Sequence, residues 1–160
     1  MTTISNRLVG FPNPVNEKAA RVVAGLVVLS AVSALLLQAG WLLWLLALGF
    51  LLRVLSGPRF SPFGLLATRV VAPRLGPPRL VPGPPKRFAQ GLGLAFSLTA
   101  ALCVSLGATT VGWVLVGLLV IAAVLESVFA FCLGCAIFGR LQQVGLIPES
   151  VCEACVVASR

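Results

Sequence analysis

Residues 22–38, VVAGLVVLSAVSALLLQ, form a continuous stretch without a single charged side chain. An apolar stretch of about 17–25 residues is long enough to cross the hydrocarbon core of a bilayer as a helix. Similar stretches recur further along the chain, at about 41–55, 88–106 and 111–138. The sequence therefore predicts an all-α membrane protein with four transmembrane helices, built as a single integral membrane domain over residues 1–160.

The composition supports a membrane protein and excludes several classes of site. Hydrophobic residues make up 59 % of the chain and charged residues 10 %, with a mean hydropathy of +1.06, whereas soluble domains are about 45–50 % apolar and about 25 % charged. Histidine and aspartate are absent and only four acidic residues are present. This excludes histidine-based catalysis, a hydrolase carboxylate dyad and a carboxylate cage for calcium or magnesium. The net charge of +8 does not indicate nucleic-acid binding, because the basic residues flank the apolar spans.

The connections between the spans predict the topology. The turns at 38–40 and 107–110 are short and uncharged, so the four spans form two antiparallel hairpins. The basic residues outside the spans lie in the N-terminal segment, in the loop 56–87 and in the tail 139–160. By the positive-inside rule these segments face the cytoplasm. We therefore expect a multi-pass protein of the plasma membrane with both termini cytoplasmic.

The central loop 56–87 is rich in proline and arginine. Ser61-Pro62 is typical of a helix start, with serine as N-cap and proline in the first turn. The residues that follow predict a short amphipathic helix lying in the membrane interface. Arg59 and Arg69 belong to this basic loop, and together with Arg53 they would attract an anionic partner or substrate, such as a sulfur oxyanion.

Two Cys-x-x-Cys pairs are the most distinctive motifs of the chain. Cys132 and Cys135 lie at the cytoplasmic end of the fourth span, and Cys152 and Cys155 lie in the tail. Cytosolic thiols are normally reduced, which argues against a permanent structural disulfide. We favour a thiol/disulfide or sulfur-relay component that works with a cytosolic thiol or sulfur-carrier protein, with Cys132 and Cys135 as the exchanging pair. Because this pair would lie near the C-terminus of a long helix, the helix dipole should raise its pKa values.

The same cysteines permit two other interpretations. The spacing C-x2-C-x16-C-x2-C is compatible with a four-cysteine zinc site formed by Cys132, Cys135, Cys152 and Cys155, which would staple the tail to a non-enzymatic membrane scaffold. Buried cysteines can also serve simply as small apolar side chains. The sequence leaves open whether the protein is an enzyme.

Glu126 is the one acidic residue inside a predicted span. A carboxylate within the bilayer is costly unless it is paired or protonated. Arg53, near the cytoplasmic end of the second span, is the expected partner in an ion pair between helices. Alternatively, Glu126 would handle protons or a polar substrate in a small transporter.

Two segments resemble a known family. FPNPVNEKAAR at 11–21 and FCLGCAIFGRL at 131–141 frame the four spans and the basic loop SGPRFSPFG at 56–64. Together they resemble the DUF4395 family of small bacterial multi-pass membrane proteins, whose function is undetermined. The resemblance implies a family motif that includes Asn16, Glu17, Arg53, Pro58, Arg59, Pro62, Cys132 and Cys135.

Overall fold

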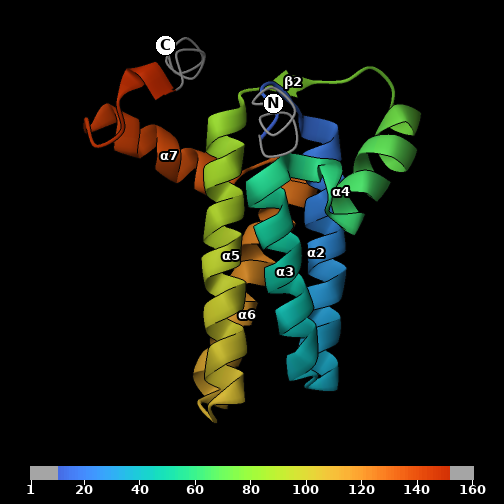
Figure 1. Cartoon of the computed structure of the whole chain (residues 1–160), viewed down its shortest axis with the longest axis vertical. Coiled ribbons are helices and arrows are strands. Elements are labelled where there is room, and N and C mark those ends of the chain that lie inside the picture. Colours follow the sequence, from blue (N-terminus) through green and yellow to red (C-terminus); the bar gives the residue numbers. More distant parts are fainter. Residues whose placement is uncertain (1–10, 152–160) are drawn as a thin grey trace, which may run out of the picture.

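Four long helices stand side by side as a bundle in the computed structural model, which describes residues 11–151 (Figure 1). Each of the four, the second taken together with the helical turns that follow it as far as Leu75, is long and apolar enough to cross a membrane, and this confirms the predicted all-α fold class. The four helices are α2 (Glu17–Leu37), α3 (Gly40–Ser56), α5 (Gly83–Ser105) and α6 (Thr109–Phe129). Short turns join α2 to α3 and α5 to α6, as the sequence predicts.

The bundle is closed, because each long helix packs against two others. Helix α3 contacts α2 and α5, and helix α6 contacts α2 and α5 as well. Small side chains permit the close approach: Ala31 and Ala34 of α2 and Ala100 and Ala101 of α5 are completely buried. A Cβ added at Gly93 would lie 2.2 Å from the Phe50 ring, so glycine is what lets α5 pack against that ring of α3.

The segment between α3 and α5 is largely helical. It comprises η1 (Gly57–Arg59), α4 (Pro62–Leu66), η2 (Ala67–Val71), a π-helical turn, and η3 (Ala72–Leu75), which follow one another around the end of the bundle. Ser61 caps α4 as predicted, its side chain accepting a hydrogen bond from the backbone N–H of Gly64. The short strand β2 (Leu80–Val81) then pairs antiparallel with β1 (Val15–Asn16). Both segments lie at the end of the bundle opposite the two short turns (Figure 1).

The third span begins earlier than the sequence predicts. We expected it to start at Phe88, but α5 begins at Gly83 and contains Lys86 in its first turn. Lys86 is buried there. Proline at the second and third helical positions starts the helix without a conflict, since the first N–H groups of a helix have no partner within it.

The fourth predicted span, 111–138, is wrong as a single helix. Helix α6 ends at Phe129, Ala130 adopts a left-handed conformation with φ of 58°, and a separate helix α7 (Leu133–Gln143) follows. Arg21 of α2 caps the end of α6 by donating hydrogen bonds to the carbonyl oxygens of Ser127 and Val128. Helix α7 then leaves the bundle beside α5 (Figure 1). The apolar side chains run on across the break, so hydrophobicity alone does not reveal it.

Candidate functional site: a dithiol at the start of a helix

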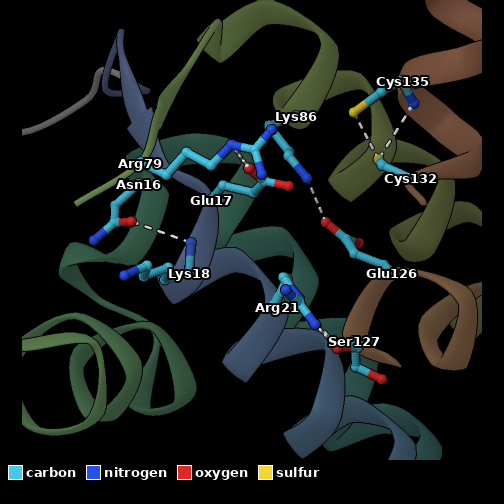
Figure 2. A network of polar contacts seen from close by, with 10 residues as sticks. All are labelled: Asn16, Glu17, Lys18, Arg21, Arg79, Lys86, Glu126, Ser127, Cys132 and Cys135. Atoms are coloured by element: carbon cyan, nitrogen blue, oxygen red, sulfur yellow. Dashed lines mark hydrogen bonds and ion pairs between the residues drawn. The ribbon is translucent and has the colours of Figure 1, made fainter. Parts of the chain in front are cut away.

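The first cysteine pair lies at the N-terminus of α7. Cys132 is the N-cap residue, and its Sγ accepts a hydrogen bond from the Cys135 backbone N–H at 3.3 Å. The Cys135 thiol donates to the same sulfur, with the two sulfur atoms 2.6 Å apart (Figure 2). Both thiols are free and partly exposed. The pair is therefore arranged so that a disulfide needs only a small movement to form.

This position reverses the expected effect of the helix on the pair. The sequence placed the cysteines near a helix C-terminus, but the break at Ala130 puts them at the start of a new helix, whose N-terminus favours a thiolate. The hydrogen bond from the Cys135 thiol holds the pKa of Cys132 below its ordinary value, against the opposing effects of burial and the Glu126 carboxylate; Lys86 adds to the lowering. The same hydrogen bond, together with burial, raises the pKa of Cys135. Cys132 is thus the more readily ionised thiol of the pair.

The glycine between the cysteines fixes α7 against the bundle. A Cβ added at Gly134 would lie 2.5 Å from both Cα and Cβ of Ala89 in α5, so only glycine fits this contact without displacement. One turn further on, the Phe138 ring packs against Phe88 of α5 with centroids 5.7 Å apart. The Cys-x-Gly-Cys sequence therefore serves packing as well as chemistry.

Glu126 pairs with Lys86 and not with Arg53, so the predicted ion pair is wrong. Lys86 Nζ lies 2.7 Å from Glu126 Oε1 (Figure 2), and the two side chains are only 9 % and 14 % exposed. The prediction failed because Lys86 was assigned to the loop, whereas the early start of α5 brings it into the bundle. Lys86 and Glu126 both act electrostatically on the two thiols, which joins the ion pair and the dithiol into one site.

Arg53 is buried in a polar pocket of its own. Its Nε donates to Gln90 Oε1 at 2.7 Å and its Nη1 donates to Ser61 Oγ at 3.1 Å, while the guanidinium lies over the Phe50 ring, 4.4 Å from the centroid. Arg53 therefore connects α3 to α5 and to the cap of α4. Its role here is to position neighbouring groups, among them the Gln90 side chain.

Two arginines of the basic loop, Arg59 and Arg69, lie on another side of the bundle (Figure 1). Arg59 and Arg69 are exposed and belong to η1 and η2, and η2 packs on α2, whereas α7 packs on α5 and α6 (Figure 1). The structure thus brings Lys86 to the dithiol instead of these arginines.

A cavity of about 300 Å³ lies beside the dithiol. All five of the helices α2, α3, α5, α6 and α7 contribute to its wall, which is mostly aliphatic and includes the rings of Phe50 and Phe96. The polar residues of the wall are Gln90, Glu126 and Cys132. Nothing in the sequence pattern indicated this cavity, because its lining residues come from helices far apart in the chain.

The second cysteine pair, Cys152 and Cys155, lies outside the described residues, so the four-cysteine zinc site stays a prediction. Within residues 11–151 no group of three or more metal-binding side chains comes together. The described part of such a site would consist of Cys132 and Cys135 alone.

A sequence model of the DUF4395 family, described as a domain of unknown function, matches residues 15–143. The chain belongs to this family. The match confirms the resemblance drawn from the two terminal segments and the loop. In this DUF4395 protein the matched range includes Lys86, Glu126 and the first cysteine pair, and it ends before Cys152. Searches of curated proteins and of solved structures gave no match.

Several residues behind the DUF4395 resemblance have structural roles. Asn16 caps α2 by accepting from the Lys18 backbone N–H at 3.1 Å, and Glu17 forms an ion pair with Arg79 at 2.9 Å (Figure 2). These contacts hold the start of α2 next to the segment that leads into α5. The sequence analysis did not identify the roles of Lys86, which it assigned to the loop, and of Ala130, which it placed within a continuous span.

Proposed function

We propose that this protein is a multi-pass protein of the plasma membrane, with both termini in the cytoplasm, that exchanges thiols and disulfides with a cytosolic partner. The single observation that supports the exchange is the asymmetric dithiol: Cys132 Sγ accepts two hydrogen bonds from Cys135 at the start of α7. One sulfur is thereby prepared to attack and the other retains its proton. The orientation follows from the basic residues at one end of the bundle.

The exchange follows from these roles. The Cys132 thiolate attacks a disulfide of the partner, forms a mixed disulfide and releases one partner thiolate, which takes up the Cys135 proton. The Cys135 thiolate then attacks Cys132 Sγ, forms the Cys132–Cys135 disulfide and releases the second partner sulfur as a thiolate, which is protonated from water. The reverse sequence reduces the pair and oxidises the partner.

The geometry favours dithiol exchange over storage of sulfane sulfur. A persulfide on Cys132 would carry its reactive sulfur–sulfur bond within reach of the Cys135 thiol, because the two cysteine sulfurs lie 2.6 Å apart. Attack by Cys135 would expel hydrosulfide and close the disulfide. A sulfur relay through this pair would therefore release the sulfane sulfur as hydrosulfide unless the acceptor were already bound.

Redox titration of the full-length protein in detergent tests this function. We expect one two-electron transition in glutathione buffers, detected by alkylation and mass spectrometry of the peptide that holds both cysteines. The variant Cys103→Ser, which changes the free thiol in α5, should keep the transition, and Cys132→Ser should lose it. Cys135→Ser should trap a partner as a mixed disulfide on Cys132. Stoichiometric zinc that is lost in Cys152→Ser, together with no titratable dithiol, would support the zinc staple and overturn the exchange.

A further inference from the structure

The cavity beside Cys132 has the volume and the apolar lining of a site for a lipid-soluble molecule. Its volume of about 300 Å³ falls at the lower end of the range for small-molecule pockets. Four of its lining residues are also exposed on the outer surface of the bundle: Leu118 (48 %), Ile121 (57 %), Leu133 (36 %) and Ile137 (43 %). The cavity therefore reaches the surface where α6 and α7 are apolar, and a ligand can enter it sideways from the bilayer.

The polar groups of the wall narrow the class of ligand. Cys132 places its sulfur in the wall, and together with Cys135 it can release two electrons by forming a disulfide. Gln90 lines the same cavity, and because its Oε1 accepts from Arg53 Nε, its amide nitrogen is left as a donor. Phe50 and Phe96 supply aromatic surface, which suits a flat ring. An apolar site with a hydrogen-bond donor and a thiolate fits a flat ring that bears carbonyl oxygens.

We propose that this cavity binds a quinone dissolved in the membrane, which accepts two electrons from the Cys132–Cys135 dithiol. This inference rests on the proposed function, since it names the membrane-side oxidant of the same pair. The pair then connects two reactions: a cytoplasmic partner dithiol reduces the Cys132–Cys135 disulfide, and a quinone that enters from the lipid oxidises the resulting dithiol again.

The electron transfer balances within the site. The Cys132 thiolate adds to a ring carbon of the quinone, and one carbonyl oxygen takes up a proton. The Cys135 sulfur then attacks Cys132 Sγ, the carbon–sulfur bond breaks, and its electron pair returns to the ring. The Cys135 proton reaches the second oxygen, which gives one disulfide and one hydroquinone. The first proton comes from the Lys86 ammonium and passes to the quinone oxygen through the hydrogen-bonded Glu126 carboxylate in the cavity wall. Water then returns a proton to Lys86.

Stopped-flow oxidation of the reduced full-length protein in lipid nanodiscs tests the proposal. The probe is decylubiquinone, and absorbance reports its reduction while mass spectrometry reports the disulfide. We expect one hydroquinone for each disulfide and a rate that saturates with quinone concentration. Ala122→Phe adds a ring to the cavity wall on α6 and should slow the reaction by about tenfold or more. Val114→Phe, an exposed residue of α6 outside the lining, is the matched control and should react as the wild type does.

Glutathione disulfide serves as a second, water-soluble oxidant that separates the two proposals. A dithiol that glutathione disulfide oxidises and decylubiquinone does not would overturn the quinone site and leave the exchange function standing. A quinone reaction that never saturates and is equally fast in Ala122→Phe would also overturn the site, because it would be a collision with free quinone. A dithiol that neither reagent oxidises would overturn both proposals.

Discussion

Lys86 Nζ and Glu126 Oε1 lie 2.7 Å apart and tie the first turn of α5 to the last turn of α6. Both side chains are largely buried, and both act on the charge of the neighbouring thiols. The ion pair therefore contributes to stability and to reactivity, and the two contributions can be separated experimentally.

Removing one charge of this pair should destabilise the bundle. Glu126→Gln leaves the Lys86 ammonium buried without its counter-charge, and breaking a buried pair in this way costs about 3–5 kcal/mol. Unfolding in detergent, followed by circular dichroism, measures the loss. The double variant Lys86→Met/Glu126→Leu is the control and should recover most of it, because it leaves no unpaired charge. Equal destabilisation of the single and double variants would contradict the buried pair.

The two thiols should titrate at different pH. Since the hydrogen bond from the Cys135 thiol lowers the pKa of Cys132, this cysteine stays a thiolate at pH values where an ordinary thiol, with a pKa of about 8.5, is protonated. Iodoacetamide should therefore modify Cys132 first, with a rate that rises at a lower pH than the rate for Cys135. Quantitative mass spectrometry of the peptides gives both profiles.

Two variants check the cause of this asymmetry. Cys135→Ala removes the hydrogen-bonding thiol and should raise the pH midpoint of Cys132 alkylation, and Lys86→Gln should raise it by a smaller amount because the Lys86 charge is a smaller contribution. Identical pH profiles for Cys132 and Cys135 in the wild type would show that the helix start and the hydrogen bond do not distinguish them.

Gly134 and Gly139 offer a matched pair of substitutions on α7. Gly134→Ala would push a Cβ into Ala89 of α5, whereas Gly139→Ala meets no atom within 4 Å. We expect Gly134→Ala to lower stability by about 1–3 kcal/mol, the usual cost of overpacking. Gly139→Ala should raise stability by up to about 1 kcal/mol, since alanine favours a helix over glycine. Thermal unfolding compares them, and an equal effect of both would exclude the close contact between α5 and α7.

Arg53 should not tolerate replacement by lysine. Its guanidinium donates to Gln90 and Ser61 from different nitrogens and lies over Phe50, an arrangement that a single ammonium cannot reproduce. We expect Arg53→Lys to lower the free energy of unfolding by about 1–3 kcal/mol. The exposed Arg69→Lys is the control, with an expected effect within about 0.5 kcal/mol.

The proposed orientation in the membrane predicts a labelling pattern. Two labelling sites are introduced in a chain whose native cysteines are replaced by serine. Ala108→Cys is in the exposed turn between α5 and α6. Ser150→Cys is in η4 (Glu149–Val151), a segment that follows α7 at the opposite end of the bundle (Figure 1). A membrane-impermeant maleimide added to intact cells should label position 108, and position 150 only after permeabilisation. The reverse pattern would place the dithiol on the outside.

The sequence predicted the four long helices, their two short turns and the cap at Ser61, because long apolar runs and capping side chains are local signals. It did not predict the partner of Glu126, since Lys86 follows a proline-rich stretch typical of a loop. The helix break at Ala130 was not predicted either, because alanine is an unusual residue in the left-handed conformation and the apolar pattern continues on both sides. Arg21 of α2 contacts the last carbonyl groups of α6 at this break, and a contact between segments so far apart in the chain leaves no signal in the local sequence.

The left-handed Ala130 has a consequence for the order of assembly. An L-residue adopts this conformation at a cost of about 1–2 kcal/mol, and Arg21 from the far end of the chain helps to hold it by capping the last carbonyl groups of α6. Without this contact from α2, the chain around Ala130 is more favourable as one continuous helix. Both cysteines would then lie in the middle of that helix and not at the start of a new one. We therefore expect the Cys132 thiol to become reactive only once α2 has docked on α6, because the contact from Arg21 favours the break that places this cysteine at a helix start.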